Sequence, residues 1–454
     1  MQILQGMQVV VIGLGAAGLS TVRHLLRRGA QVKVSDRRAA AQIEPETLAF
    51  LAQAGVALET GGHSSAFLAG ADLVVPGPGV PLDAPVLCAA REQGLPIVGE
   101  LALAAGQYPV PVIAVTGSNG KTTVTSLIGD LLKASGKKPF VGGNIGTPLL
   151  DYFAAPDLYD SVVLELSSFQ LDLAGDFRPD VGLLLNISPD HLDRHGSLAA
   201  YARAKQNIFR SQQPGDHAVL GGDDPAAAAT PLNAGVERFT FGRHQGAAAR
   251  IADGRVNLRL AGAEAVFNLG QTKLHSSVNQ LNAAAAVLAA TLAGCDQAGI
   301  AAGLAGYQPP PHRMAEVAVI DGVRFINDSK ATNIGALEAA LGGSEAPVVL
   351  IAGGRDKGGD YNLLRDVVAR KVKRLVLVGE AADLMQAALG SIAPTETATT
   401  LDDAVRRAAA AAVDGDLVLL APGCSSYDMF SGYEERGRVF AECVRRLDQE
   451  RSLS

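Results

Sequence analysis

The sequence lacks the cysteine patterns that hold small extracellular domains together or bind structural zinc. Its 454 residues include only four cysteines, Cys88, Cys295, Cys424 and Cys443, which lie far apart and form no Cys-x-x-Cys pair. A disulfide framework or a zinc knuckle is therefore not expected, and this usage is typical of the reducing cytoplasm.

Long apolar runs and an excess of positive charge are missing as well. The alanine-rich stretch Ala283–Ala293 is too short to span a bilayer and is expected to form a buried helix. The N-terminal MQILQGMQVVVIG has no basic segment, so we interpret it as a first strand rather than a signal peptide. The formal net charge of -7 argues against broad binding to nucleic acid or membranes. We therefore expect a cytoplasmic protein without nucleic-acid or membrane partners.

What is present is a globular composition with an alternating pattern. Hydrophobic residues make up 48% and charged residues 19% of the chain, and short β-branched runs alternate with alanine- and leucine-rich stretches. This pattern predicts an α/β fold with mainly parallel sheets. The length and the proline-containing stretches at 106–111 and 307–314 suggest three domains. We expect a Rossmann-like domain at 1–99, a central P-loop α/β domain at 100–308 and a second Rossmann-like domain at 309–454.

Local patterns also predict individual elements. In the first domain we expect strands near Val9–Ile12, Val32–Ser35, Leu73–Val75 and Ile97–Val98. The more polar, glycine-rich stretch Arg238–Gly270 is expected to form hairpins.

The stretch VTGSNGKTT, residues 115–123, resembles a phosphate-binding loop but is shorter than usual. The common pattern is G-x-x-x-x-G-K-[ST], and its first glycine would fall at Val115. Glycines allow backbone N–H groups to approach phosphate oxygens, and a helix N-terminus adds partial positive charge. Lys121 would neutralise phosphate charge and Thr122 would offer a hydroxyl to Mg²⁺. The alternative is an ordinary glycine-rich turn, which the lysine and the paired threonines make less attractive.

Two further segments carry candidate metal or phosphate groups. Glu165 lies inside an apolar strand, where a buried carboxylate needs a partner, either a metal ion or a core arginine. His191 and His195 have the spacing of a zinc pair, but the glutamate of H-E-x-x-H is absent, so we favour a single histidine near Mg²⁺ or the transferred phosphate. By itself, Lys205 is an ordinary helix lysine.

The stretch VIGLGAAGLS near the N-terminus contains the pattern G-x-G-x-x-G. Gly13, Gly15 and Gly18 stand between a predicted strand and a predicted helix, and Asp36 follows at the end of the next strand. This arrangement predicts a nucleotide-diphosphate site more securely than it predicts NAD. A glycine turn that serves only close packing remains the alternative.

Three loops of the last domain follow predicted strands, namely INDSKATN (326–333), AGGRDKGGD (352–360) and APGCSSYDMFSGYEERG (421–437). Ligands of open α/β sheets bind at the carboxyl ends of strands, so we expect these loops to converge on one anionic ligand. Cys424 has no evident histidine partner and is interpreted as a packing residue.

Taken in order, these motifs resemble the Mur ligase family. TGSNGKTT matches its T-G-x-x-G-K-[ST] pattern, and GGNIGTP, ELSSFQL, NISPDHLDRHGS, PPHRM and INDSKATNIGALEAAL extend the likeness over nearly the whole chain. The GLGxxG start, SSFQL and the SSYDMFSGYEERG ending are most similar to members that add D-glutamate to UDP-N-acetylmuramoyl-L-alanine. The resemblance implies a monomeric, ATP-dependent amide ligase of peptidoglycan precursor synthesis that works through an acyl phosphate.

The resemblance also assigns residues to ligands. It implies that the UDP-sugar contacts Gly15, Ala16, Ala17, Asp36, Arg37, Arg38, Gly77, Gly79, Asn144 and His191. It implies that ATP contacts Gly117, Ser118, Asn119, Gly120, Lys121, Thr122, Thr123, Asn279, Asn282, Arg313 and Asp328. It implies that the amino acid contacts Thr332, Lys357, Ser426 and Tyr433. It implies catalytic roles for Lys121, Glu165, His191 and Lys205. It makes Lys205 a carbamoylated lysine, and it implies two Mg²⁺ ions near Thr122, Glu165, His191 and Lys205.

Three alternatives remain open at this point. A Mur-type ligase could add another amino acid, such as L-glutamate. An NAD-dependent oxidoreductase would use residues 1–99, and a nucleotide-binding switch would lack ligase chemistry.

Overall fold

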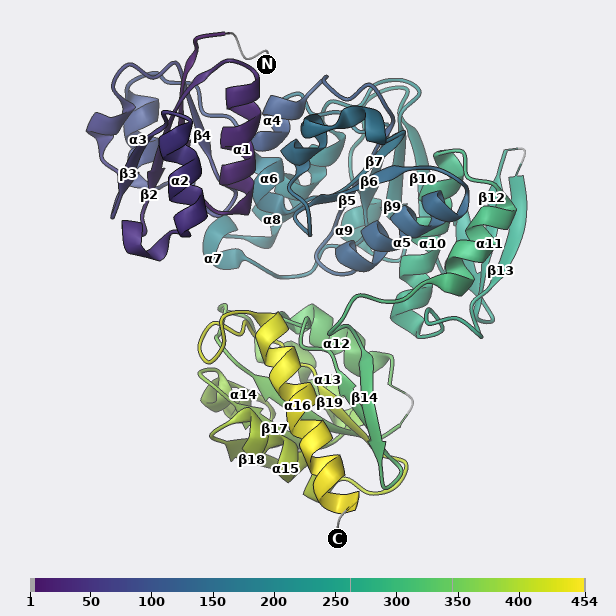
Figure 1. Cartoon of the computed structure of the whole chain (residues 1–454). Helices are drawn as coiled ribbons and strands as arrows, with labels where there is room; N and C mark the ends of the chain where they lie inside the picture. The colour runs from purple at the N-terminus through teal and green to yellow at the C-terminus, as the bar shows by residue number, and fades with distance from the viewer. Residues whose placement is uncertain (1–4, 262, 345, 453–454) are drawn as a thin grey trace. The chain divides into compact units, whose positions relative to one another are not determined.

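Three sheets form the framework of the computed structural model, which describes residues 5–261, 263–344 and 346–452 (Figure 1). By their contacts the residues divide into two units. Unit 1 comprises the chain up to Asn186 together with Ala202–Asn268 and Ala283–Gly306. Unit 2 comprises Ile187–Tyr201, Leu269–Asn282 and the chain from Tyr307 onward.

The first sheet of unit 1 has the strand order β3-β2-β1-β4 and is parallel throughout. Its strands are β1 (Gln8–Ile12), β2 (Gln31–Asp36), β3 (Ala57–Thr60) and β4 (Leu73–Pro76). Its helices are α1 (Ala16–Arg27), α2 (Pro45–Gln53), α3 (Pro85–Glu92) and α4 (Glu100–Ala104). The sequence pattern missed β3 because this edge strand has no fully buried residue. The predicted strand Ile97–Val98 is wrong, since Ile97 makes only an isolated bridge to Val74.

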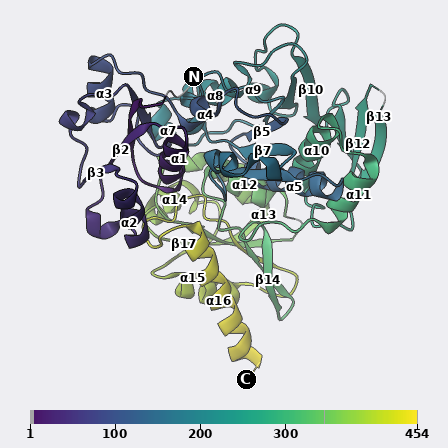
Figure 2. The same cartoon turned by 45° about the horizontal axis from the view of Figure 1, so that its top comes forward.

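The second sheet of unit 1 has nine strands in the order β13-β12-β11-β10-β9-β8-β5-β7-β6. Its strands are β5 (Val112–Thr116), β6 (Pro139–Gly143), β7 (Ser161–Glu165), β8 (Val181–Leu184), β9 (His217–Gly221), β10 (Glu237–Gly242), β11 (Ala249–Ala252), β12 (Arg255–Leu260) and β13 (Ala263–Asn268). The pairs from β6 to β11 are parallel, and β11-β12-β13 is an antiparallel meander within the stretch for which hairpins were expected. Figure 2 shows β5 and β7 adjacent, with α5 beside them.

Helices follow the strands of this sheet along the chain. They are α5 (Lys121–Ala134), α6 (Ser168–Asp172), α7 (Leu192–His195), α8 (Leu198–Gln206), α9 (Pro225–Ala228), α10 (Ser277–Leu292) and α11 (Gln297–Gly306). Residues Ala283–Ala290 of α10 are fully buried, which confirms the buried helix expected from the alanine-rich run. In the described part of the chain, no helix combines the length and apolarity needed to cross a membrane.

The sheet of unit 2 has six strands in the order β14-β15-β19-β16-β17-β18, all parallel except for β14. Its strands are β14 (Ala315–Ile320), β15 (Val323–Asn327), β16 (Val348–Gly353), β17 (Val372–Val378), β18 (Thr395–Ala398) and β19 (Leu417–Leu420). Its helices are α12 (Ile334–Gly342), α13 (Arg365–Lys371), α14 (Ala382–Leu389), α15 (Leu401–Ala411) and α16 (Tyr433–Ser452).

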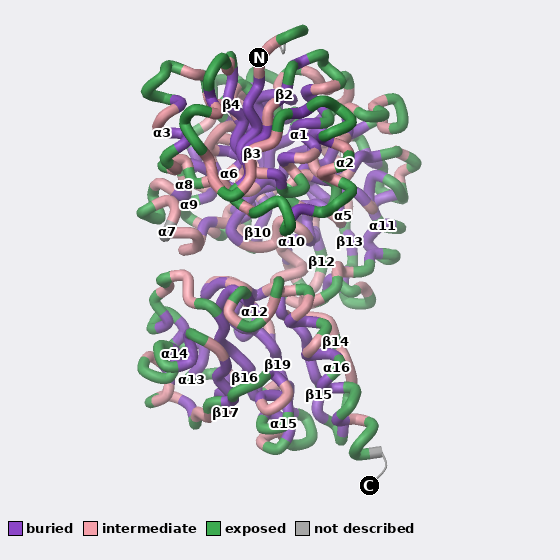
Figure 3. The backbone as a smooth tube through the Cα atoms, turned by 60° about the vertical axis from the view of Figure 1, so that its left-hand side comes forward, coloured by how far each residue is buried: buried purple, intermediate pink, exposed green. Residues whose placement is uncertain are grey.

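Both faces of this sheet are covered, which explains why its central strands β16 and β19 are apolar throughout. Successive strand residues point to opposite faces, so Ile326 and Leu350 join one core while Phe325 and Val349 join the other. One core includes residues of α12, α13 and α14, and the other includes residues of α15 and α16. The central strands are accordingly buried in Figure 3.

Within unit 1, α1 of the first sheet packs against the 3₁₀ helix Leu149–Ala154, which follows the second sheet's β6. The Ser20 hydroxyl donates to Asp151 Oδ1 at 2.7 Å, and the His24 ring lies 5.1 Å from the Phe153 ring. Burial, helped by the charges of Arg27 and Arg28, lowers the pKa of His24 to about 4. His24 is therefore neutral at physiological pH and acts as a packing residue between the two sheets.

Glu100 is a second buried titratable group of unit 1, and it makes stability depend on pH. Burial raises its pKa to about 7, although Gln170 Nε2 donates to Glu100 Oε1 at 2.8 Å and opposes the rise. The folded state therefore holds this proton between pH 4.5 and about 7 while the unfolded chain releases it. The contribution of Glu100 to stability is present below pH 4.5 and is lost as the pH rises through 7.

We expect Glu100→Gln to stabilise the protein at pH 8 by up to about 3 kcal/mol and to change little at pH 5. The amide keeps an acceptor for Gln170 without burying a charge. The midpoint of urea unfolding at both pH values measures the effect, and Glu92→Gln on the exposed part of α3 is the matched control. Equal midpoint shifts at pH 5 and pH 8 would contradict the expectation.

Candidate active site

The shortened loop between β5 and α5 depends on its two glycines. Gly120 precedes α5 with φ of 85°, a left-handed conformation that glycine adopts without strain. A Cβ at Gly117 would lie 2.9 Å from Leu185 Cβ, so the chain could not pass there with a side chain. No side chain caps the N-terminus of α5 at Gly120. The backbone N–H groups in the first turn of α5 are therefore left for the loop region, where an anion can accept hydrogen bonds from them.

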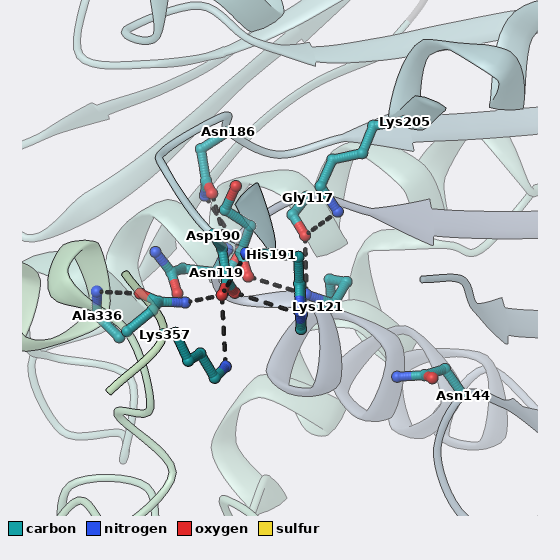
Figure 4. Close-up of polar contacts among 12 residues, drawn as sticks. Gly117, Asn119, Lys121, Asn144, Asn186, Asp190, His191, Lys205, Ala336 and Lys357 are labelled. Atoms are coloured by element: carbon teal, nitrogen blue, oxygen red, sulfur yellow. Dashed lines mark hydrogen bonds and ion pairs between the residues drawn. The ribbon is translucent and has the colours of Figure 1, made fainter. Parts of the chain in front are cut away.

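Two lysines meet at one carbonyl of this loop. Lys121 Nζ donates to Gly117 O at 2.8 Å and to Ser118 O at 2.9 Å, and Lys205 Nζ donates to Gly117 O at 2.8 Å (Figure 4). Lys205 comes from α8 and is only 1% exposed. The fold therefore places a second lysine beside the phosphate-type loop, a proximity that the spacing in the sequence could not reveal.

Glu165 ends β7 beside Val115 of β5, at the same edge of the sheet as the loop. Its Oε1 accepts a hydrogen bond of 3.0 Å from Asn144 Nδ2. Its Oε2 is buried and has no hydrogen-bond partner among the residues that the structure describes. A buried carboxylate oxygen without a partner fits a divalent cation. Among the described residues no three His, Cys, Asp or Glu side chains cluster.

Asn186 is a functional candidate that the sequence analysis missed. Its backbone carbonyl accepts from Ser118 N at 2.9 Å, its Oδ1 accepts from Asn119 N at 2.8 Å and its Nδ2 donates to Asn119 O at 3.1 Å. These three bonds hold the loop in shape. The available signal was an asparagine shortly after the apolar strand β8, where site residues of parallel sheets gather.

The N-terminal glycine motif has the geometry of a diphosphate-binding turn. Gly13 has φ of 89°, and a Cβ at Gly18 would lie 2.0 Å from Gly13 O, so both positions require glycine. A Cβ at Gly15 would meet no atom within 4 Å. Space beside Gly15 is what a nucleotide diphosphate needs in order to approach the backbone at the start of α1.

Asp36 binds the glycine turn itself. Its Oδ2 accepts from Leu14 N at 2.6 Å, and its carboxylate also pairs with Arg38 at 2.9 Å. Burial opposes ionisation, but the hydrogen bonds from Arg38 and Leu14 outweigh it and lower the pKa of Asp36 to about 2. Asp36 is therefore ionised and shapes the turn, whereas the neighbouring Arg37 is exposed.

The other predicted contacts of the UDP group belong to unit 1 as well. Ala16 and Ala17 are the first residues of α1. Gly77 N donates to Ile12 O at 2.8 Å, and a Cβ at Gly79 would meet no atom within 4 Å.

In unit 2, the structure brings together the three loops that were expected to converge. Gly423 N donates to Ala331 O at 2.8 Å, and Arg355 N donates to Ser425 O at 2.8 Å. The predicted residues Thr332, Lys357 and Ser426 lie on these loops at the carboxyl ends of β15, β16 and β19.

Arg436, at the start of α16, ties two of these loops together and was missed from the sequence. Its side chain is 3% exposed and donates to Ser329 O at 2.8 Å and to Cys424 O at 3.2 Å. Burial lowers its pKa to about 10, so it stays charged. The predicted Tyr433 lies one turn earlier, and its carbonyl accepts from Ser329 at 2.9 Å. Cys424 is 1% exposed, and burial raises its pKa to about 11, which supports packing over nucleophilic chemistry.

Asp190 joins Lys357 to the start of α12 within unit 2 and was also missed. Its Oδ1 lies 3.4 Å from Lys357 Nζ, and its Oδ2 accepts from Asn333 Nδ2 at 2.9 Å. Asn333 in turn caps α12 through Ala336 N at 2.8 Å. The next residue, His191, has the left-handed φ of 54°, which is rare outside glycine and costs energy, as occurs at functional sites.

The remaining predicted ATP contacts also fall in unit 2. Asp328 Oδ1 accepts from Met314 N at 3.1 Å, and burial raises the pKa of Asp328 to about 6 against the opposing effects of this bond and of Arg313. At the start of α10, Asn282 Nδ2 donates to Asn279 Oδ1 at 3.2 Å.

The predicted residues therefore divide between the two units. The turn around Gly13–Gly18 and the loop around Gly117–Thr123 with Lys205, Glu165 and Asn144 belong to unit 1. His191, Asn279, Asn282, Arg313, Asp328, Thr332, Lys357, Ser426 and Tyr433 belong to unit 2.

Comparison with known proteins gives matches along almost the entire chain. Residues 7–99 match the Mur ligase MurD-like N-terminal domain, 115–290 the Mur ligase middle domain and 312–424 the Mur ligase glutamate ligase domain. The UDP-N-acetylmuramoylalanine--D-glutamate ligase of Desulfotalea psychrophila is 46% identical over 96% of this chain and 95% of its own length. That of Acidobacterium capsulatum is 43% identical over 97% of this chain and 96% of its own length.

Among solved structures, a MurF ligase from Thermotoga maritima in complex with ADP has a TM-score of 0.60 at 17% identity. The match covers 98% of this chain and 96% of the MurF chain. At 17% identity, this similarity is evidence for a shared fold alone.

Proposed function

Because the chain belongs to the Mur ligase family, we infer that it is an ATP-dependent ligase that adds D-glutamate to UDP-N-acetylmuramoyl-L-alanine in peptidoglycan precursor synthesis. The observation that carries this conclusion is the near full-length similarity to relatives with this activity, at 46% and 43% identity. The geometry agrees, because a glycine loop with two lysines and a buried carboxylate provides a nucleotide triphosphate site.

The chemistry begins with activation of a carboxylate, which is a poor acyl donor at neutral pH. The L-alanyl carboxylate attacks the γ-phosphorus of ATP, ADP leaves, and an acyl phosphate forms. The D-glutamate amine then attacks the acyl carbon, loses a proton and forms a tetrahedral intermediate that expels inorganic phosphate. In this scheme Lys121 and the N-terminus of α5 stabilise negative charge on the phosphoryl oxygens.

We assign the metal-binding role on the family resemblance and, for Glu165, on its buried surroundings. The Thr122 hydroxyl and Glu165 Oε2 would hold one Mg²⁺, and the family resemblance implies a role toward a second Mg²⁺ for His191 and for Lys205. When bound, Mg²⁺ supplies electrostatic stabilisation of the phosphoryl oxygens. Asn144 orients Glu165 by its 3.0 Å hydrogen bond to Oε1, which leaves Oε2 for the ion.

We assign the other ligands by their loops. The turn at Gly15–Ala17, with Asp36, Arg37, Arg38, Gly77 and Gly79, would hold the UDP group, since Gly15 leaves open space for a diphosphate. Thr332, Lys357, Ser426 and the backbone near Tyr433 would hold the two glutamate carboxylates. Asn279, Asn282, Arg313 and Asp328 would contact ATP. A structure solved with the nucleotide, UDP-sugar and amino acid bound tests each assignment.

We further propose that Lys205 carries a carbamate. The side chain is 1% exposed, and its N–H could still donate to Gly117 O after carbamoylation. With ¹³C-bicarbonate we expect the wild-type protein to show a carbamate carbon by NMR and the folded Lys205→Ala variant to lack it. Full activity without any carbamate signal would contradict this role.

The substrate assignment is tested by phosphate release with ATP, Mg²⁺ and UDP-N-acetylmuramoyl-L-alanine. D-glutamate, L-glutamate, L-alanine and meso-diaminopimelate are added in separate reactions. Release with D-glutamate alone is the expected result. Release with another amino acid would overturn the amino-acid assignment, and no release with any of them would overturn the ligase assignment.

We also propose that the enzyme acts as a cytoplasmic monomer without nucleic-acid or membrane partners. Sedimentation of the purified protein at assay concentration tests the oligomeric state, and a stable dimer would contradict the proposal.

A further inference from the structure

The antiparallel meander at one end of the nine-stranded sheet has two different faces. On one face, Ala249, Ile251, Val256 and Leu258 are at most 5% exposed and pack into the core. The register sets Arg250 opposite Asn257 and Ala252 opposite Arg255. Because side chains alternate along a strand, Arg250, Arg255 and Arg259 share the face that turns away from this core.

The three arginines are not neutralised by the protein. In the part of the chain that the structure describes, no ion pair or side-chain hydrogen bond engages any of the three guanidinium groups. Glu264 stands directly opposite Arg259 in the register and still forms no ion pair with it. Arg250 Nε is, in addition, buried, and no described residue forms a hydrogen bond with it. A buried donor without a partner is costly, so the site favours a ligand that accepts from it.

These side chains line a hollow of about 260 Å³ rather than a flat surface. Gln245 and Asn257 add amide groups to its wall, and Asp253 is its only acidic member. Three arginines and one aspartate give the wall a formal charge of +2, in a chain whose net charge is -7. The volume lies just below the usual range for drug-sized ligands, so it suits a small molecule.

We propose that this hollow binds a small soluble anion that carries a diphosphate group. Guanidinium groups present planar forks of N–H donors that match phosphate oxygens, and amides complete the set of donors. The site is distinct from the loop at Gly117–Thr123. β11 stands four strands away from β5 in the sheet, which is about 19 Å at the usual strand spacing.

The test measures binding of inorganic pyrophosphate to the full-length protein by calorimetry at low ionic strength. Lys121→Ala serves as the background, so that binding at the loop of α5 is weakened. In this background we expect Arg255→Gln with Arg259→Gln to weaken binding at least tenfold. Arg91→Gln, which removes an exposed arginine of α3, is the matched control and is expected to leave binding unchanged.

Two further experiments distinguish recognition of a diphosphate from attraction by charge alone and from binding to a membrane. Arg255→Lys with Arg259→Lys keeps the charge but removes the forks, and an intermediate loss of affinity is expected. Thermal midpoints equal to that of the background show that the variants fold. Equal pyrophosphate affinity in the background and in the double glutamine variant would overturn the proposal. Co-sedimentation with phosphatidylglycerol vesicles without pyrophosphate binding would also overturn it, in favour of a membrane headgroup.

Discussion

Lys121→Ala is expected to lower kcat by about 10²–10³-fold while the protein stays folded. The Lys121 ammonium lies at the loop carbonyls Gly117 O and Ser118 O, at 2.8 and 2.9 Å, where the phosphates of ATP would bind. Its positive charge offsets the charge that develops on the transferred phosphoryl group, so its loss acts on the transition state. Phosphate release under saturating ATP and D-glutamate measures the effect.

Lys133→Ala is the matched control for this experiment. Lys133 lies on the same helix, its side chain is 61% exposed and it forms an ion pair with Asp130 at the surface. Surface ion pairs of this kind contribute little to the free energy of unfolding, so kcat and the thermal midpoint are expected to stay near the wild-type values. A Lys121→Ala variant with activity close to that of Lys133→Ala would remove Lys121 from the mechanism.

Glu165→Gln is expected to lower kcat by about 10²-fold and to raise the Mg²⁺ concentration needed for half-maximal activity. Gln can still accept the hydrogen bond from Asn144, but it removes the negative charge at Oε2, which no described residue contacts by a hydrogen bond. The ion would therefore lose a charged ligand while the local packing stays nearly the same. Initial rates over a Mg²⁺ titration measure both quantities.

Glu100→Gln is the control for Glu165→Gln because the two carboxylates have similar hydrogen-bond surroundings. Each carboxylate is buried, accepts from one amide and has one oxygen without a partner. Glu100 lies at the start of α4, so its replacement is expected to change stability and not the Mg²⁺ requirement. Equal Mg²⁺ titrations of wild type and Glu165→Gln would exclude a metal-binding role for Glu165.

The fold class was predictable because its signals are local. Runs such as Val348–Ala352 and Leu417–Leu420 are apolar at every residue, which indicates strands covered on both faces, and the structure confirms this arrangement. The strand β3 escaped prediction because its sequence ALET has no buried position, and Ile97–Val98 was wrongly predicted because two apolar residues cannot distinguish a strand from a single bridge.

The candidate site was predictable where a motif is contiguous. The glycines of the two turns and Lys121 were identified because strand, turn and helix follow one another directly in the chain, and Glu165 was identified because it is a carboxylate inside an apolar strand. Asn186, Asp190 and Arg436 were missed because their importance depends on partners 67, 167 and 107 residues away in the sequence. Lys205 was identified as a candidate only through the family resemblance, because its own segment has the pattern of an ordinary helix.

The sequence by itself determined the α/β layers, the two glycine turns and the family, because these depend on residues that are neighbours in the chain. Only the tertiary structure decided which side chains meet. It brought Lys205 to the Gly117 carbonyl across 88 residues, directed Asp36 to the turn at Leu14, and set three arginines on one face of a meander through strand register. The physical reason is that hydrogen bonds, charge pairing and burial act between atoms within a few ångströms, and chain folding alone determines those distances.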